Sequence, residues 1–249
     1  MRSRVEIVAE LDRQGRTRLT RLWAKGALGV RRTGEAHVHL VGTAAGPIGD
    51  DTIDIDIEVG DGARLCVEGV AATIALPGAA AGIGALHQQL WLGESSTLQL
   101  ALPALILTEG AVVQSRTEIA ASSSAELVLI EQVSLGRFEE AGGRWAGRML
   151  ADVDGLPSLR QSQTSESILQ ALITAGRPSA GSGAIVSRLE LGPQVDASAA
   201  VATAGNAINA LLEHGGRLMT SIGASLAEAH RDLNGLMAPV VVAKAEFIV

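Results

Sequence analysis

The stretch DTIDIDIEV, residues 51–59, decides the fold class of this chain. Isoleucine and valine occupy every second position from Ile53 to Val59, and aspartate or glutamate occupies the positions between them. This period of two residues is typical of a β-strand that buries one face and exposes the other. Gly60-Asp61-Gly62 then indicates a tight turn, and residues 64–68 continue as the next strand.

The same unit recurs along the chain at a spacing of about 30 residues. Small polar turns at residues 94–96 and 122–124 each lead into an alternating strand, at 97–102 and 125–130. A turn that launches a half-buried strand at regular intervals predicts sheets that stack on one another. We therefore expect a mainly β fold with layered or sandwiched β-sheets and β-helix-like stacking.

The last third of the chain predicts a few helices. Residues 197–213 are rich in alanine, and residues 221–233 place Ile222, Leu226, Ala229 and Leu233 at helical spacing before Asn234-Gly235. Residues 168–173 fit a strand or a short helix. We expect a single domain over residues 1–249, with a β framework at 1–165 and mixed strands and helices packed on it at 166–249.

Composition excludes several classes of protein. The 249 residues carry a net charge of −7 and only 2% aromatic residues, so the chain lacks the basic surface and the stacking rings of a nucleic-acid-binding protein. A single cysteine, Cys66, fits a reducing compartment, and the first residues lack the apolar core of a signal peptide. Proline and glycine break the uncharged run 69–93, which therefore does not predict a membrane span. These features predict a cytoplasmic protein.

The sequence contains no complete motif for nucleotide binding or nucleophilic catalysis. Gly82-Ile83-Gly84 lacks the third glycine of a dinucleotide fingerprint, and no GxxxxGK[ST] or GxSxG motif is present. Cys66 lies within a predicted strand, where it is expected to be a buried small side chain rather than a nucleophile.

Candidate metal ligands are present. His37 and His39 are two residues apart on a predicted strand, so both imidazoles point the same way, as in β-sheet metal sites, although they could equally occupy a polar strand face. Carboxylates concentrate at Asp51, Asp54 and Asp56, where a hard-cation site or a solvated strand face would fit. Glu131 interrupts an apolar run and either faces solvent or lines a polar interior.

Several motifs follow one another in a familiar order. They are RLTRLWAKGAL at 18–28, His37-Val38, a loop that keeps Gly46, Gly49 and Asp51, DIDIEVGDGA at 54–63, EQVSLGRF at 131–138, and GRLM at 216–219. Together they resemble the urease accessory proteins of the UreD (UreH) type. Ala45 and Asp50 stand where members usually carry glycine, and residues 73–77 and 103–106 lack polar groups of the family pattern, so the chain looks like a divergent member.

The resemblance implies a non-enzymatic chaperone for nickel insertion. Such proteins bind UreF, recruit the GTPase UreG through it, and dock on apo-urease, with nickel passing through an internal tunnel. It implies no tightly bound cofactor, only nickel in transit, with Asp51, Asp54, Asp56, Glu131 and the pair His37/His39 as candidates for transient contact. Weak, oxygen-rich ligation would suit transfer, since a tight imidazole site would retain the ion.

Partner contact is expected at two apolar stretches, because their exposure in an isolated chain would favour aggregation. These are the predicted helical region 197–233, with Ile222, Leu226 and Leu233, and the loop 77–86 that begins at Pro77.

Two other functions remain open from the residues alone. One is a small metal-dependent β-fold enzyme, cupin-like, that uses His37, His39 and an acidic residue. The other is a structural β-layer protein without a metal role. The enzyme would need a further ligand from a distant strand, and His87 is the only other histidine in the predicted β region.

Overall fold

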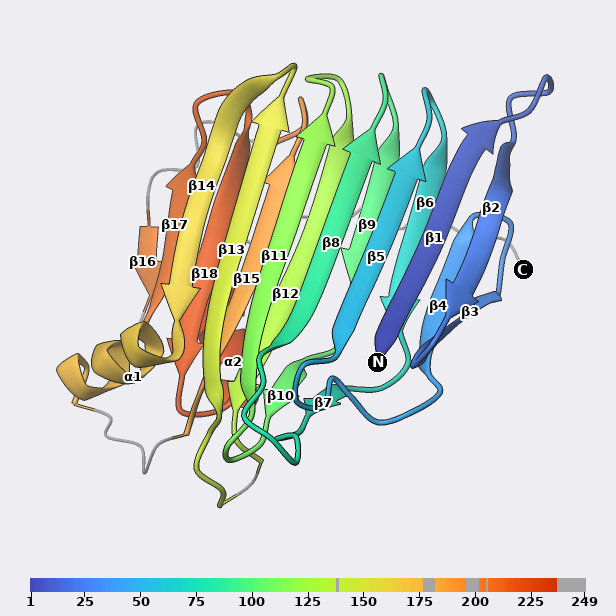
Figure 1. The fold of residues 1–249 in the computed structure, drawn as a ribbon. Helices are drawn as coiled ribbons and strands as arrows, with labels where there is room; N and C mark the ends of the chain where they lie inside the picture. The colour runs from blue at the N-terminus through green and yellow to red at the C-terminus, as the bar shows by residue number, and fades with distance from the viewer. Residues whose placement is uncertain (138, 177–181, 196–201, 205, 237–249) are drawn as a thin grey trace.

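In a computed structural model, the chain folds into two facing β-sheets with two described helices near the C-terminal part (Figure 1). The structure describes residues 1–137, 139–176, 182–195, 202–204 and 206–236. Most of these residues lie in strands, which confirms the expected mainly β class with stacked sheets.

Sheet 1 has seven strands in the order β14-β13-β11-β8-β5-β1-β2. Their bounds are β1 (Arg2–Leu11), β2 (Thr17–Lys25), β5 (Thr52–Val59), β8 (Gly84–Leu92), β11 (Val112–Ala121), β13 (Arg144–Val153) and β14 (Leu156–Thr164).

Sheet 2 has eleven strands, nine of them in the order β16-β17-β18-β15-β12-β9-β6-β4-β3, while β10 pairs with β12 and with β7. Their bounds are β3 (Leu28–Arg32), β4 (His37–Gly42), β6 (Arg64–Gly69), β7 (Thr73–Ala75), β9 (Thr97–Ala101), β10 (Leu105–Leu107), β12 (Glu126–Leu135), β15 (Gly183–Leu191), β16 (Ala202–Ala204), β17 (Ala207–Leu211) and β18 (Gly216–Gly223).

The middle of the chain winds between the two sheets as a solenoid. Each turn contributes one strand to sheet 1 and then a strand to sheet 2, in the succession β5–β6, β8–β9 and β11–β12, and the short strands β7 and β10 of sheet 2 follow β6 and β9. Consequently β5, β8, β11 and β13 are parallel neighbours in sheet 1, and β6, β9 and β12 are parallel neighbours in sheet 2 (Figure 1). The 30-residue recurrence in the sequence is this winding.

Hydrogen bonds join successive turns at the corners where the chain passes from sheet 1 to sheet 2. The backbone N–H of Glu94 donates to Asp61 Oδ1 at 2.8 Å, and that of Ser95 donates to Ser124 Oγ at 3.0 Å. One turn further on, Ser123 N–H donates to Oδ1 of Asp154, in the β13–β14 turn of sheet 1, at 3.0 Å. The small polar residues of these turns therefore hold the stack in register, because their side chains satisfy backbone groups that no strand pairs.

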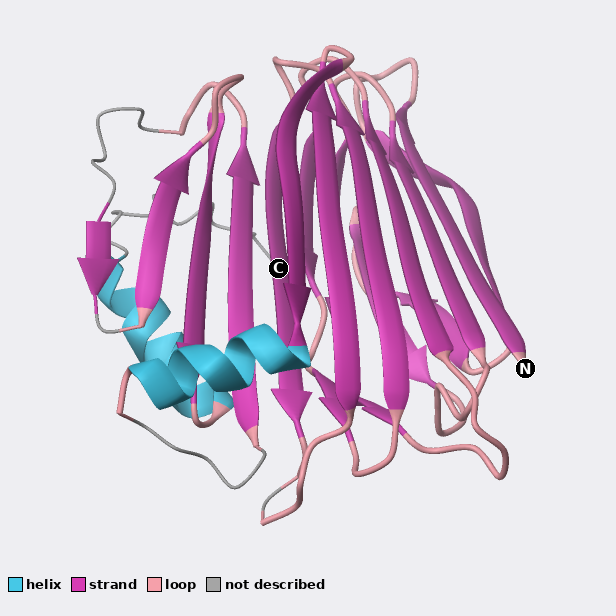
Figure 2. Ribbon diagram, turned by 60° about the vertical axis from the view of Figure 1, so that its left-hand side comes forward, coloured by secondary structure: helices cyan, strands magenta, loops and turns pink. Residues whose placement is uncertain are grey.

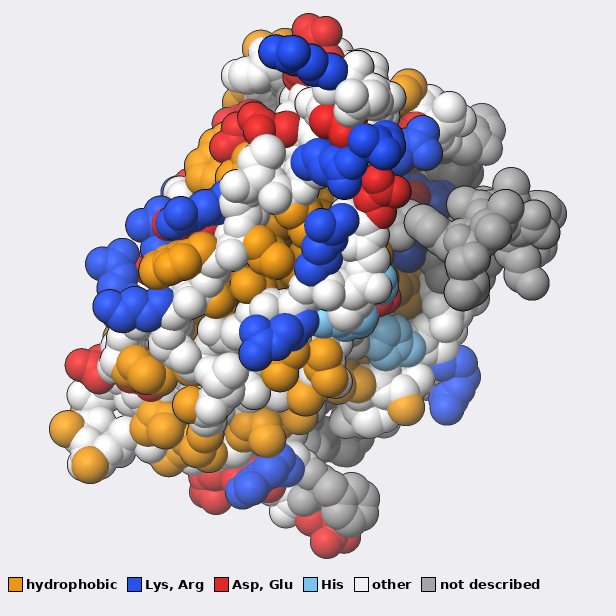
Figure 3. Space-filling view, turned by 90° about the vertical axis from the view of Figure 1, so that its right-hand side faces the viewer, with side chains coloured by type: hydrophobic (Ala, Val, Ile, Leu, Met, Phe, Trp, Pro, Cys, Tyr) orange, Lys and Arg blue, Asp and Glu red, His pale blue; other side chains and the backbone are white. Residues whose placement is uncertain are grey.

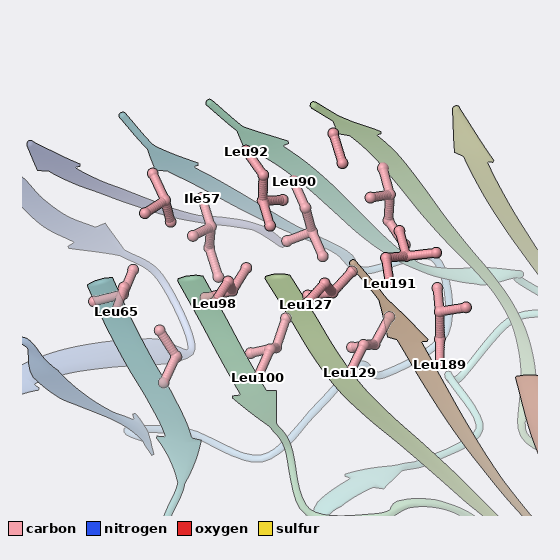
Figure 4. Packing of buried hydrophobic residues seen from close by; sticks show 14 of the residues in the cluster. Ile57, Leu65, Leu90, Leu92, Leu98, Leu100, Leu127, Leu129, Leu189 and Leu191 are labelled. Atoms are coloured by element: carbon pink, nitrogen blue, oxygen red, sulfur yellow. The ribbon is translucent and has the colours of Figure 1, made fainter. Parts of the chain in front are cut away.

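The inner faces of the two sheets form the main core. The alternating residues Ile53, Ile55, Ile57 and Val59 of β5 are all at most 2% exposed, as the sequence pattern predicts. Leucines of β6, β8, β9, β12 and β15 continue this layer from turn to turn (Figure 4).

The C-terminal part adds antiparallel strands and two helices. β15 pairs with β12 and with β18, so it extends sheet 2 beyond the parallel turns. Residues 168–173, for which the sequence fits either a strand or a short helix, lie in helix α1 (Ser165–Thr174). Its buried Ile168 and Leu172 pack with Trp145. Helix α2 (Leu226–Leu236) packs on sheet 2 through Ala229 and Leu233 (Figure 2).

Two helix expectations need correction. The alanine-rich segment does not form a helix at 202–204 and 207–211, which are the antiparallel strands β16 and β17; residues 197–201 and 205 lie outside the described residues. Burial alternates along β17, with Ala207 and Asn209 buried and Ile208 exposed, so pairing with β18 overrides alanine's helix propensity. The second helix begins at Leu226, whereas residues 221–223 complete β18, which places Ile222 on a strand.

Within the described part of the chain, neither helix is long enough or apolar enough to span a membrane.

Candidate functional site

A cavity of about 210 Å³ lies between the two sheets, beside the apolar core. Its walls come from the inner faces of β5, β8 and β12 and from the ends of β4 and β6. Exposed alanines at positions 44, 45, 71 and 72 line it on one side, so the cavity opens to solvent between two loops of small residues.

Glu131 is the charged side chain that lines this cavity. It lies on the inner face of β12, where Leu127 and Leu129 occupy the equivalent positions before it. Thr117 donates a short hydrogen bond to Glu131 Oε1, and Gln88 Nε2 donates to the same oxygen at 3.2 Å. The protein surrounds the carboxyl group, and access to it runs through the cavity. Loss of hydration raises the pKa of Glu131, and the Thr117 hydrogen bond offsets part of that rise.

Gln88 completes a polar cluster with Thr117 and Glu131. Its side-chain nitrogen donates both to Thr117 Oγ1 at 3.2 Å and to Glu131, in the amide orientation that this network favours. Its carbonyl oxygen Oε1 is buried without a hydrogen-bond partner. An unpaired buried acceptor is costly in an ordinary core, whereas a cation or water in the cavity could bind to it. Carboxylate and amide oxygens together form a donor set for a hydrated divalent cation.

His37 and His39 lie elsewhere, on the outer face of sheet 2. His37 Nε2 is 2.8 Å from Glu68 Oε2, and His39 Nε2 is 3.6 Å from the same oxygen. The two imidazole rings are 4.7 Å apart between centroids. The histidines therefore point the same way, as the spacing of two predicts, and Glu68 of the neighbouring strand joins them.

The three aspartates of the predicted cation cluster are already engaged by cations of the chain. Asp54 contacts Arg2 at 3.1 Å and His87 at 3.1 Å, and Asp56 contacts Arg4 at 2.9 Å. Both aspartates lie on the outer face of sheet 1. Asp51 binds the N-terminal ammonium group and accepts a hydrogen bond from Ile48 N–H, and the ammonium group lowers the pKa of Asp51.

The predicted partner contacts differ in exposure. Pro77 is exposed on its loop, and Leu226 is half-buried at the start of α2. Ile222 is half-buried on β18, and Leu233 is only 3% exposed beneath α2. Leu233 therefore holds the helix on the sheet and is not itself accessible to a partner in this structure.

The structure does not bring the six predicted metal contacts into one site. Glu131 lines the interior cavity, the histidine pair lies outside sheet 2, and the aspartates lie at sheet 1. Sequence reasoning missed Gln88, Thr117 and Glu68, because each joins its cluster across strands about 14 to 43 positions apart in the chain. A polar residue at an inward-facing position is the available sequence signal. It stands out only at Glu131, which follows an apolar run. Cys66 is half-buried rather than buried as expected, because alternation along β6 points Leu65 and Val67 into the core and Cys66 outward. Its partial burial and the nearby Glu68 carboxylate raise the pKa of its thiol, which disfavours the reactive thiolate.

Comparison with known proteins identifies one family. The family model described as "UreD urease accessory protein" matches residues 2–245. Proteins named "Urease accessory protein UreD" from a Parafrankia species, Frankia alni and Streptomyces coelicolor are 38%, 39% and 34% identical to this chain. The alignments cover 63%, 47% and 65% of this chain and 54%, 40% and 65% of the respective relatives, so the chain matches less than two thirds of each relative's length.

Proposed function

This chain belongs to the UreD family of urease accessory proteins, and from that membership we propose that it supports nickel insertion into apo-urease. Its role is that of an accessory protein rather than an enzyme, since the relatives carry that name. In this proposal the chain is a scaffold that binds UreF, recruits UreG through UreF, and docks on apo-urease in the cytoplasm. The alternative of a cupin-like enzyme gains no support from the family.

The cavity with Glu131 carries the proposal. Nickel would be the cargo, and Glu131 with the unpaired Gln88 Oε1 would offer it oxygen ligands along an interior path. Oxygen ligands bind nickel more weakly than imidazoles do, so they favour passage over storage. Asp51, Asp54 and Asp56 are weaker candidates, because ammonium and guanidinium groups of the chain already neutralise them.

Solvent exposure decides which of the predicted partner contacts we propose as direct ones. The loop at Pro77 and the accessible side of α2 near Leu226 are the proposed contacts for UreF or apo-urease. Ile222 and Leu233 would contribute indirectly, by positioning β18 and α2.

The test is co-expression of this chain with UreF, UreG and apo-urease from the same source, followed by measurement of nickel in purified urease. We expect co-purification with these partners, and nickel in urease only when the chain is present. Glu131→Ala should lower the nickel content severalfold while complex formation persists.

Glu126→Gln is the matched control, because Glu126 lies on the same strand but on its outer face. It should leave nickel content unchanged. Full nickel delivery by Glu131→Ala would remove Glu131 from the path. Failure of the chain to bind any of the three partners would overturn the scaffold role itself.

A further inference from the structure

A second candidate metal site lies outside the cavity, where β4 and β6 run parallel in sheet 2. Alternation places His37 and His39 of β4 and Glu68 of β6 on the outer face, while Val38 and Val67 point into the core and are fully buried. The register sets His39 directly beside Glu68. Two imidazoles and one carboxylate thus share a patch of a rigid sheet, and this is the one such group of three potential ligands among the described residues.

The spacing of the three ligand atoms fits a single ion. Metal–nitrogen and metal–oxygen bonds of about 2.0–2.2 Å place neighbouring ligand atoms roughly 3 Å apart. Glu68 Oε2 is 2.8 Å from His37 Nε2 and 3.6 Å from His39 Nε2, and the three residues each offer one ligand atom within 4.8 Å of the other two. Small rotations of the side chains would therefore suffice to bring them around one ion.

A further hydrogen bond orients one of the imidazoles. Thr33 Oγ1 is 2.9 Å from His39 Nδ1. In the tautomer with the proton on Nδ1, the Nδ1–H group donates a hydrogen bond to Thr33 Oγ1, and the lone pair of Nε2 points toward Glu68 and is free to bind a metal. Outer contacts of this kind fix the tautomer and the ring orientation of metal-binding histidines.

The site is accessible from solvent. The side chains of His37, His39 and Glu68 are 36%, 28% and 47% exposed. Figure 3 looks onto the end of the molecule that carries β2 to β4, and there histidine side chains form a small group at the surface. An ion could bind without any opening of the fold, and water could fill its remaining coordination positions.

We propose that His37, His39 and Glu68 form a surface binding site for one divalent late transition-metal ion, of the Ni²⁺ or Zn²⁺ class. Two imidazoles and a carboxylate select these ions over Ca²⁺ and Mg²⁺, which prefer all-oxygen sites. The site goes beyond the proposed nickel path, because it uses none of the cavity's polar residues.

The proposed metal site nevertheless lies close to the opening of the cavity. Leu40 and Gly69 line the cavity, and each directly follows a residue of the site, His39 and Glu68 respectively. The ion would therefore lie on the outer side of the strand ends whose inner side forms the wall of the cavity.

The test is calorimetric titration of the metal-free full chain with NiCl₂ and, separately, with ZnCl₂. We expect one ion to bind at this site. X-ray absorption spectra of the bound nickel should show scattering from imidazole ligands. His37→Ala, His39→Ala and Glu68→Gln should each weaken that binding at least about tenfold. Thr33→Val should weaken it less, and Thr33→Ser should restore it, with the melting temperature unchanged in both.

Two controls separate this site from the others. His87→Ala removes an exposed histidine that also contacts a carboxylate but has no second imidazole, so it should leave binding unchanged. Glu131→Gln alters the cavity and should leave the imidazole signal intact. Unchanged affinity and spectra in the folded His37→Ala and Glu68→Gln variants would overturn the site, whatever the outcome of the nickel-delivery experiment.

Discussion

Two neighbouring regions of one interior, called below the apolar end and the cavity end, differ in chemistry although the same strands build both. At one end β8 and β12 contribute Leu90 and Leu129, which are fully buried in a continuous layer of aliphatic side chains. Two residues away on the same faces, Gln88 and Glu131 line a cavity with an unpaired oxygen and a desolvated carboxyl group. Two positions further along each strand, close-packed aliphatic side chains thus give way to a polar cavity.

The two regions contribute differently to the stability of the fold. Aliphatic side chains at the first end stabilise the chain through burial and close packing. At the cavity end, the unpaired Gln88 oxygen and the desolvated Glu131 carboxyl group cost stability. The proposed nickel path gives this cost a reason, since it needs oxygen ligands inside the fold.

The largest expected effect concerns the apolar end. Leu129→Ala should lower the free energy of unfolding by about 2–5 kcal/mol, because it removes buried methyl groups and leaves a hole between the sheets. Chemical denaturation with urea measures the loss. A loss below about 1 kcal/mol would mean that this end is not close-packed, and the contrast between the two ends would disappear.

The next effect concerns the cavity end and depends on pH. The pKa of Glu131 is raised in the folded chain above its ordinary value of 4.5, so between these two values the folded state binds the proton and the unfolded state does not. The free energy of unfolding should therefore fall as pH rises from 4.5 through the raised pKa, by about 1.4 kcal/mol per pH unit between the two pKa values.

Glu131→Gln should remove this fall, because the amide keeps an oxygen acceptor for Thr117 and Gln88 but carries no charge. The measurement is urea denaturation of both chains between pH 4 and pH 9. We expect the variant to gain stability relative to the wild type as pH rises. Parallel pH profiles would show that the carboxyl group is hydrated in the folded chain.

Much of the fold could be predicted from the sequence, because local patterns repeat in it. The alternation at 51–59 and the turns at 94–96 and 122–124 correspond to β5 and to two solenoid corners. The strands β16 and β17 could not be predicted in this way, since their alanines favour a helix and only pairing with β18 decides otherwise.

The candidate site was predictable only in part, for a similar reason. Glu131 stands out because it breaks an apolar run in its own strand. Its partners Gln88 and Thr117 lie on β8 and β11, and nothing in the sequence states that these positions face the same cavity. The same holds for Glu68, which reaches His39 only through the parallel register of β4 and β6.

A smaller effect is expected at the corners that join the solenoid turns. Asp61→Ala removes the acceptor of the Glu94 N–H at one corner and should cost about 0.5–1.5 kcal/mol of stability. Hydrogen exchange of the Glu94 amide should become faster in the variant. This hydrogen bond involves neither Glu131 nor its partners, so the change should leave the pH profile of the wild type intact; a changed profile would link the corner to the cavity.

The smallest effect is expected on the outer face of sheet 1, where charge is abundant but hydrated. Asp56 contacts Arg4 at 2.9 Å, and the pKa of Arg4 is raised mainly by that hydrogen bond. Exposed ion pairs of this kind contribute little, because water and salt screen them. Asp56→Asn should therefore leave the denaturation midpoint within experimental error of the wild type at 0.15 M salt, and nickel delivery to urease should be unchanged as well. A clear loss of nickel delivery with unchanged stability would move the proposed nickel path from the polar cavity to this outer face, and the unpaired oxygen of Gln88 would then need another explanation.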